Sequence, residues 1–315
     1  MTVLALLALV VGLAVLVQAA DHFVDGAVRL ANRTSLTPVV VGAVVLGFGT
    51  SAPELLVSGL AARQGDAAFG IGNIVGSNIA NLSLVLGAAA LVARLPLPPT
   101  AIRREAPLAI GSGLLFAVVV QGGIGRAEGL VLLVLMISAL TWLLVAPGED
   151  DVVADAVDSV DSAGSGLVVE LVRTAVALVA TLVGARLVVW GAGSLAEALG
   201  VSTGMVGLTI VAVGTSLPEL VTVIVAARRA ETGLIVGNLL GSNLFNSLSV
   251  GAAVGLLGNG AAAGSAVAIT GASVMVLVSL VALVFMITKR VVVRWEGVVL
   301  LGLYAITVTM VGAGP

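Results

Sequence analysis

The chain has 315 residues, of which 59% are hydrophobic and only 10% are charged, and its mean hydropathy is +1.22. Roughly a quarter of the residues of a soluble globular protein are charged, so this composition excludes a soluble globule. The net charge of −3 gives no sign of nucleic-acid binding. The absence of cysteine excludes disulfides and leaves the redox compartment undetermined.

Long apolar runs dominate the chain, and short segments rich in Arg, Pro, Gly and Asp separate them. Runs of about 20 apolar residues are typical of bilayer-spanning helices. The first run has no Lys or Arg before it, so we interpret it as a retained helix and not as a cleaved signal. Forty glycines and few aromatic residues favour closely packed helices over a barrel.

We therefore predict an all-α membrane protein of about ten transmembrane helices. The expected spans are residues 2–29, 37–62, 68–92, 106–121 and 128–146, then 167–196, 203–227, 233–257, 265–288 and 296–313.

An internal repeat organises the chain. The segment GTSAPEL, which starts at Gly49, recurs as GTSLPEL from Gly214, and GNIVGSNIAN, which starts at Gly72, recurs as GNLLGSNLFN from Gly237. Both pairs share an offset of 165 residues (215 minus 50). Duplicated halves of this kind are typical of secondary transporters.

The repeat predicts a first half of residues 1–146 with its motif at 49–81, and a second half of residues 167–315 with its motif at 214–246. Five spans per half is an odd number, so the second half is expected to have the inverted orientation. Residues 147–166 form an acidic linker, predicted to be a solvated spacer, with a weak regulatory Ca²⁺ site as the alternative. Its acidic residues are Glu149, Asp150, Asp151, Asp155, Asp158 and Asp161.

The basic residues indicate an orientation. If the loop after the first span is cytoplasmic, that side collects Arg29, Arg33, Arg94, Arg103, Arg104, Arg228, Arg229, Lys289, Arg290 and Arg294. The other side keeps Arg63 and Arg126. The positive-inside rule then predicts that both termini are extracellular and that the linker is cytoplasmic.

Glu54 and Glu219 lie near the middle of apolar runs, where an ionised carboxylate costs several kcal/mol. Each follows a proline, which removes a helix hydrogen bond and frees backbone oxygens. A broken helix at membrane depth is tolerated only where it lines a cavity or is buried in protein. We therefore expect a polar layer at the midplane that both halves build. A single copy of the motif could be a packing kink, but the duplicated glutamate favours a functional site.

The second motif adds oxygen atoms to the same layer, because Ser77 and Asn81, like Ser242 and Asn246, have the i, i+4 spacing of one helix face. Oxygen ligands without His, Cys or Met suit hard cations such as Na⁺ and Ca²⁺. Two nearby carboxylates repel one another when the site is empty, so Ca²⁺ and monovalent ions should occupy it in turn.

Other polar residues have simpler interpretations. Hydrogen bonding between helices is the favoured role of Asn73, Asn78, Asn238 and Asn243, with ion ligation as the alternative. The one histidine, His22, is interpreted as an interfacial residue, with proton coupling as its alternative role. Interfacial anchoring accounts for Trp142, Trp190, Trp295 and Tyr304.

At these paired motifs the sequence resembles the sodium/calcium exchanger family of the cation/Ca²⁺ antiporter superfamily, especially its compact prokaryotic members. The resemblance covers essentially the whole chain. It implies ten helices in two inverted halves, with the motif helices at the centre and the first and sixth helices sliding against them.

The resemblance also implies a set of ion ligands. Glu54 and Glu219 would be shared by Ca²⁺ and Na⁺, and Thr50 and Thr215 would add oxygens at the Ca²⁺ position. Flanking Na⁺ positions would use Ser51, Ser77, Ser216 and Ser242, with the carbonyls of Gly47 and Ala212. Some relatives have Asp where this chain has Asn246, which puts K⁺ co-transport and some proton-coupled schemes in doubt.

The expected function is secondary active exchange of Ca²⁺ for Na⁺ across the cell membrane by alternating access, without a cofactor, an obligate protein partner or nucleic acid. One alternative is a Ca²⁺/H⁺ antiporter that uses the same two glutamates. A hydrolase using Ser51 or Ser216 is weaker, since neither motif contains a His to act as base. A passive channel is a further alternative, which would conduct without a counter-ion.

Overall fold

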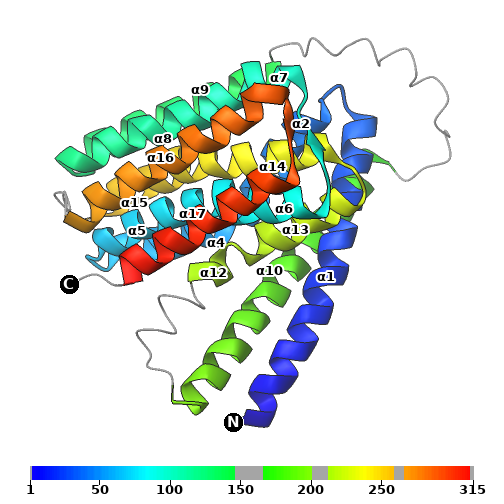
Figure 1. The fold of residues 1–315 in the computed structure, drawn as a ribbon, viewed down its shortest axis with the longest axis horizontal. Coiled ribbons are helices and arrows are strands. Elements are labelled where there is room, and N and C mark those ends of the chain that lie inside the picture. Colours follow the sequence, from blue (N-terminus) through cyan, green and yellow to red (C-terminus); the bar gives the residue numbers. More distant parts are fainter. Residues whose placement is uncertain (1, 146–165, 201–211, 259–265, 313–315) are drawn as a thin grey trace.

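The computed structural model describes residues 2–145, 166–200, 212–258 and 266–312 and is mainly helical (Figure 1). The first half contains α1 (Thr2–Arg33), α2 (Pro38–Val41), the π-helix η1 (Gly42–Gly47), α3 (Phe48–Thr50), α4 (Ala52–Arg63), α5 (Ala67–Ala80), the π-helix η2 (Asn81–Val85), α6 (Leu86–Val92), α7 (Pro99–Arg103), α8 (Glu105–Gly122) and α9 (Arg126–Val145).

The described parts of the second half follow a similar order. They contain α10 (Leu167–Ala198), α12 (Ala212–Thr215), α13 (Leu217–Arg228), α14 (Thr232–Phe245), the π-helix η5 (Asn246–Val250), α15 (Gly251–Leu257), α16 (Ala266–Lys289) and α17 (Arg294–Gly312). Two short strands, β1 (Leu95–Pro96) and β2 (Val291–Val292), pair antiparallel and join the end of α6 to the turn between α16 and α17.

Seven described helices are long and apolar enough to cross a membrane, and an eighth span is formed by the bent pair of Pro38–Thr50 and Ala52–Arg63. The prediction of an all-α membrane protein with about ten spans in two inverted repeats is confirmed. The start of the expected span at 203–227 lies outside the described residues, and α12 and α13 form its remainder. The short helix α7 was not predicted.

The inversion is visible where α1 and α10 pack side by side (Figure 1). A Cβ atom at Gly26 of α1 would lie 2.3 Å from Thr174 Oγ1 of α10, and one at Gly191 of α10 would lie 2.8 Å from the backbone nitrogen of Leu9 of α1. The offset of 165 relates Gly26 to Gly191 and Leu9 to Thr174 (26 + 165 = 191; 9 + 165 = 174). The contact of Gly26 with Thr174 therefore corresponds to the contact of Gly191 with Leu9, with the two helices exchanged. Such an exchange is the mark of a two-fold contact.

The helices of the second motif lie inside the molecule, the Pro99–Gly122 span is half buried, and four other spans face mainly outward. In the α5–α6 and α14–α15 spans 78% of the apolar window is buried, against 28% in α1, α9, α10 and α16. Glycines let the inner helices approach closely. A Cβ at Gly237 of α14 would lie 2.1 Å from the carbonyl oxygen of Val39, and one at Gly42 would lie 2.6 Å from that of Leu234. The segment that leads into the first motif of the first half, α2 and η1, therefore packs directly on α14, which carries the second motif of the other half.

The packing of α1 on α10 gives a stability prediction. Replacement of Gly184 by Ala would place a Cβ 2.6 Å from the backbone nitrogen of Leu16, and overpacking of this kind costs about 1–3 kcal/mol. We expect Gly184→Ala to lower the thermal unfolding temperature of the detergent-solubilised protein. The control is Gly111→Ala on the exposed face of α8, where no heavy atom lies within 4 Å. Equal melting of the two variants would contradict this packing.

Candidate cation site between the two halves

Glu54 and Glu219 each occupy the first turn of a helix that begins at a break. Ser51 and Ser216, at φ −85°, ψ 6° and φ −92°, ψ 8°, separate the short helices α3 and α12 from α4 and α13. The bend at Ser51 is 45°. The expected break is therefore present, but proline does not kink a continuous helix there. Pro53 and Pro218 each stand in the first turn of the new helix, where proline is tolerated.

Both carboxylates are enclosed, with 0% exposure for Glu54 and 1% for Glu219. Ser77 donates a hydrogen bond to Glu54 Oε1 at 3.3 Å, within the first half. Ser51 donates to Glu219 Oε1 at 3.2 Å, across the two halves. The two carboxylates are close enough to interact electrostatically. The sequence prediction that one glutamate from each half meets at a shared site agrees with this geometry.

Several buried polar atoms around the glutamates have no hydrogen-bond partner among the described residues. They are Oε2 of Glu54 and of Glu219, Oδ1 of Asn78, of Asn81 and of Asn246, Oγ of Ser216, Oγ1 of Thr222, and Nδ2 of Asn238 and of Asn246. A buried polar group without a partner costs free energy, and a buried charge costs more. Most of these atoms are oxygens, which a cation can coordinate.

The composition of the site suits a hard cation. Within the described ranges no three His, Cys, Asp or Glu side chains form a cluster, so two carboxylates must be supplemented by hydroxyl, amide and carbonyl oxygens. Ca²⁺ and Na⁺ are bound by such oxygen sets, whereas zinc prefers nitrogen and sulfur. The residues present therefore fit Ca²⁺ or Na⁺ as cargo.

The other predicted ligands of the first half lie beside the glutamates. Thr50 donates to the carbonyl of Leu46 at 2.9 Å and also interacts with Glu219. Ser242 donates to the carbonyl of Gly47 at 3.1 Å, so these two expected Na⁺ ligands contact each other across the halves. In the second half, Ala212 and Thr215 begin and end α12.

Asparagine amides tie the two halves together. Asn81 donates to Asn243 Oδ1 at 3.0 Å, and Asn243 donates to the backbone carbonyl of Asn78 at 3.3 Å. Asn78 in turn donates to Ser247 Oγ at 2.9 Å. Within the first half, Asn73 donates to Ser58 Oγ at 2.9 Å. The prediction that Asn73, Asn78 and Asn243 form hydrogen bonds between helices is confirmed. Asn238 accepts from Ser242 of its own helix at 3.3 Å and, across the halves, from Thr50 Oγ1 at 3.5 Å.

The two halves of the site are not equivalent in this structure. Ser51 binds Glu219, but its repeat mate Ser216 has no hydrogen-bond partner in the described part of the chain, although the offset would pair it with Glu54. Asn81 binds Asn243, but the mate Asn246 has both side-chain polar atoms unpartnered. The contacts of Ser51 and Asn81 are therefore formed, whereas the equivalent contacts of Ser216 and Asn246 are not formed among the described residues.

Sequence reasoning missed Ser58 and Thr222, which are both fully buried. They follow Glu54 by four residues and Glu219 by three, so the helical face that carries each glutamate was the available signal. The paired π-helices η2 and η5 were also missed. They start at Asn81 and Asn246, at the same offset of 165, and π-helical turns are frequent at functional sites.

The tryptophans and His22 have exposed side chains, Tyr304 is partly buried, and a place at the membrane interface stays a prediction for all of them. His22 is exposed on α1, and Trp142, Trp190 and Trp295 are 44%, 41% and 57% exposed on outward-facing helices. No contact of His22 indicates a role in the site.

An inverted repeat with an enclosed pair of carboxylates defines a polytopic membrane protein of the secondary-transporter class. The family model described as sodium/calcium exchanger protein matches residues 4–145 and 169–312. The chain belongs to the sodium/calcium exchanger family.

Individual relatives cover nearly the whole chain. The chain is 34% identical over 312 residues to the uncharacterized membrane protein MJ0091 of Methanocaldococcus jannaschii, with 96% of both chains covered. It is 30% identical over 335 residues to the sodium/calcium exchanger MaX1 of Methanosarcina acetivorans, with 95% of both covered. A solved structure of the sodium-calcium exchanger NCX_Mj soaked without Na⁺ and Ca²⁺ is similar with a TM-score of 0.86 at 33% identity, and 98% of this chain and 99% of that chain are covered.

The unpartnered oxygens predict stabilisation by ions. Since Ca²⁺ would bind the folded site and not the unfolded chain, it should stabilise the protein by about 2.7 kcal/mol at 100 times its dissociation constant. We expect Ca²⁺ to raise the melting temperature of the purified protein, and Glu54→Gln to remove most of the rise. Glu105→Gln is the control, because Glu105 is also buried, at 4% exposure, but pairs with Arg104 outside the site. A Ca²⁺ effect that Glu54→Gln leaves intact would count against the site.

Proposed function

We propose that this protein is a secondary active antiporter that exchanges Ca²⁺ for Na⁺ across the cell membrane by alternating access. The observation that carries the proposal is the enclosed pair Glu54 and Glu219, each with one unpartnered carboxylate oxygen. Membership of the sodium/calcium exchanger family and the similarity to exchanger structures support it.

Coupling follows from the electrostatics of the pair. Two buried carboxylates cannot both stay ionised and empty without a large cost, so the site changes its accessibility only when cations neutralise them. One Ca²⁺ or a set of Na⁺ ions meets that requirement, and both cannot occupy the same oxygens together. Transport in one direction therefore drives transport in the other.

The proposed ligands are those that the repeat predicts. Glu54 and Glu219 bind either ion. Thr50 and Thr215 contribute to the Ca²⁺ position, and the remaining ligands serve the Na⁺ positions. Those remaining ligands are Ser51, Ser77, Asn81, Ser216, Ser242, Asn246 and the carbonyls of Gly47 and Ala212. The present hydrogen bond between Ser242 and Gly47 would open when Na⁺ takes its place.

The proposed domain organisation is two halves, residues 1–146 and 167–315, joined by the linker 147–166. Apart from Gly166, the linker lies outside the described residues, so its role as spacer or regulatory Ca²⁺ site stays a prediction. We place both termini outside the cell and the linker in the cytoplasm, on the distribution of Lys and Arg.

Reconstituted transport tests the function. Vesicles that contain Na⁺ should take up ⁴⁵Ca²⁺ when the outside Na⁺ is removed, and an imposed pH gradient alone should not drive uptake. Because loss of one partner from a buried charged site costs about 3–5 kcal/mol, Glu54→Gln and Glu219→Gln should each reduce exchange by more than about 100-fold. Glu105→Gln should retain most of it.

Other outcomes of this assay would favour the alternatives. Uptake driven by pH and independent of Na⁺ would identify a Ca²⁺/H⁺ antiporter on the same glutamates. Uptake without any counter-ion would identify a channel.

The orientation has its own test, because the chain contains no cysteine to give background labelling. Asn32, at the end of α1, and Gln64, after α4, are both exposed and lie on opposite sides in the proposed topology. In intact cells a membrane-impermeant maleimide should label Gln64→Cys, and it should label Asn32→Cys only after permeabilisation. The reverse pattern would invert the proposed orientation.

A further inference from the structure

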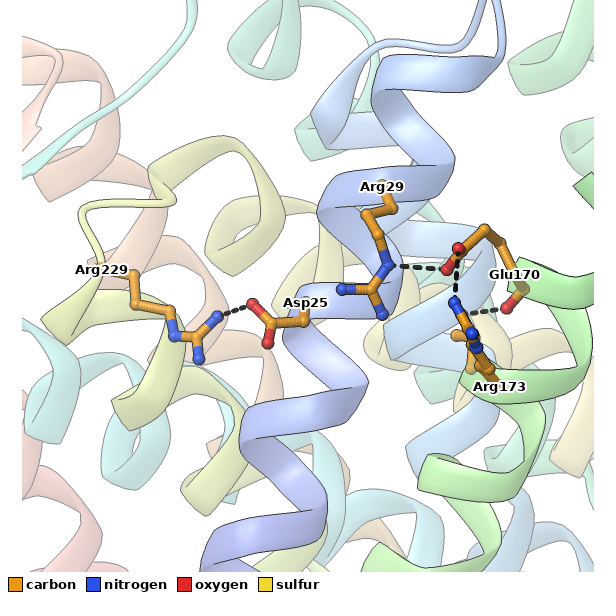
Figure 2. Close-up of polar contacts among 6 residues, drawn as sticks. Asp25, Arg29, Glu170, Arg173 and Arg229 are labelled. Atoms are coloured by element: carbon orange, nitrogen blue, oxygen red, sulfur yellow. Dashed lines mark hydrogen bonds and ion pairs between the residues drawn. The ribbon is translucent and has the colours of Figure 1, made fainter. Parts of the chain in front are cut away.

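Three charged side chains outside the ion site join α1 to the end of α13. Arg229, which follows α13, pairs with Asp25 (Figure 2) and also with Asp21 at 2.5 Å. Asp21 and Asp25 lie one helical turn apart on one face of α1, so a single guanidinium holds both. The hydrogen bond to Asp25 raises the pKa of Arg229 above its ordinary value, so the arginine stays charged.

Helix α1, with which Arg229 pairs, is itself joined to α10. Arg29 of α1 donates to the buried Glu170 of α10 at 2.6 Å, and Arg173 donates to the other oxygen of that carboxylate at 3.2 Å (Figure 2). With the glycine contacts along their length, the bond between Arg29 and Glu170 joins α1 and α10 into one unit. A restraint on α1 is therefore a restraint on both helices.

The α1–α10 unit covers the broken helices of the ion site. Phe23 of α1 and Leu178 of α10 lie against Gly49, and Val189 of α10 lies against Gly214. Since the glutamates beneath have 0% and 1% exposure, an ion can enter only if a covering element moves. Motion of α1 and α10 over the inner helices would expose the site.

The repeat shows that these ion pairs exist on one side only. The offset of 165 maps Asp21 to Arg186, Asp25 to Trp190 and Arg229 to Gln64. An arginine and a tryptophan opposite a glutamine cannot form the equivalent pair. The two end states of an inverted repeat should otherwise be close to symmetric, so this charge difference distinguishes them.

We propose that Arg229, Asp21 and Asp25 form a one-sided latch that holds α1 against the end of α13 and favours the state in which that side of the site is closed. In the proposed orientation the latched side is cytoplasmic, so the latch favours opening toward the exterior. The proposal rests on the proposed function, because a latch of this kind matters for a site reached alternately from two sides.

Distances between spin labels test the latch without ion transport. Labels on Asn32→Cys of α1 and Thr232→Cys at the start of α14 report the separation of α1 from the end of α13, in a chain free of other cysteines. Partly exposed ion pairs contribute about 0.3–1 kcal/mol each. Because Arg229 makes two such pairs, Arg229→Gln should lower the ratio of the latched to the separated population about three- to thirtyfold. Asp25→Asn should shift it in the same direction.

Two further variants distinguish an effect of the ion pairs from an effect of side-chain packing. Arg228→Gln removes the neighbouring exposed charge, which forms no ion pair among the described residues, and should leave the ratio unchanged. The exchange of charges in Asp25→Arg with Arg229→Asp should restore the latched population.

The opposite shift is expected when the latch is built on the other side, with Gln64→Arg and Trp190→Asp. Equal ratios for Arg229→Gln and Arg228→Gln would overturn the proposal, as would a charge exchange that restores nothing. Because no ion gradient is used, these results stand apart from the exchange assay, and failure of one is distinguishable from failure of the other.

Discussion

Two enclosed carboxylates that interact with each other, one from each half of the chain, are the constraint on which the rest of the structure depends. Glu54 and Glu219 keep one oxygen each without a protein partner, and such groups are costly in a low-dielectric interior. The hydroxyls of Ser51 and Ser77 offset part of this cost, and cations must offset the remainder. The requirement for neutralisation therefore links a local electrostatic cost to coupled ion exchange.

The inverted repeat explains how one short chain builds such a site. Each half supplies a broken helix that carries the glutamate and an adjacent helix that carries Ser and Asn, and glycines bring these helices into backbone contact. The same symmetry makes departures from it informative. Ser216 and Asn246 lack the partners that Ser51 and Asn81 have, and Arg229 has ion pairs that its mate Gln64 cannot form. The structure is thus asymmetric at positions where the repeated motifs are equivalent in sequence.

Much of this could be predicted from the sequence, since the signals were strong and duplicated. The length of the apolar runs predicted the membrane spans. The recurrence of GTSxPEL at a single offset indicated that Glu54 and Glu219 share a site. The π-helices at Asn81 and Asn246 could not be predicted, because a π-turn depends on tertiary packing and leaves no periodic pattern. The contacts of Arg229 were also hidden, because basic residues at helix ends are expected for topology alone. Ser58 and Thr222 were overlooked although their spacing from the glutamates was readable.

The most direct measurement is a crystal structure of the protein grown with Ca²⁺ or its heavier analogue Sr²⁺, in which anomalous scattering locates the ion. The account predicts a peak between Glu54 and Glu219, at about 2.3–2.6 Å from oxygens of both side chains, that disappears when the crystal is soaked in concentrated Na⁺. A peak elsewhere in the molecule, or one that high Na⁺ leaves in place, would contradict it.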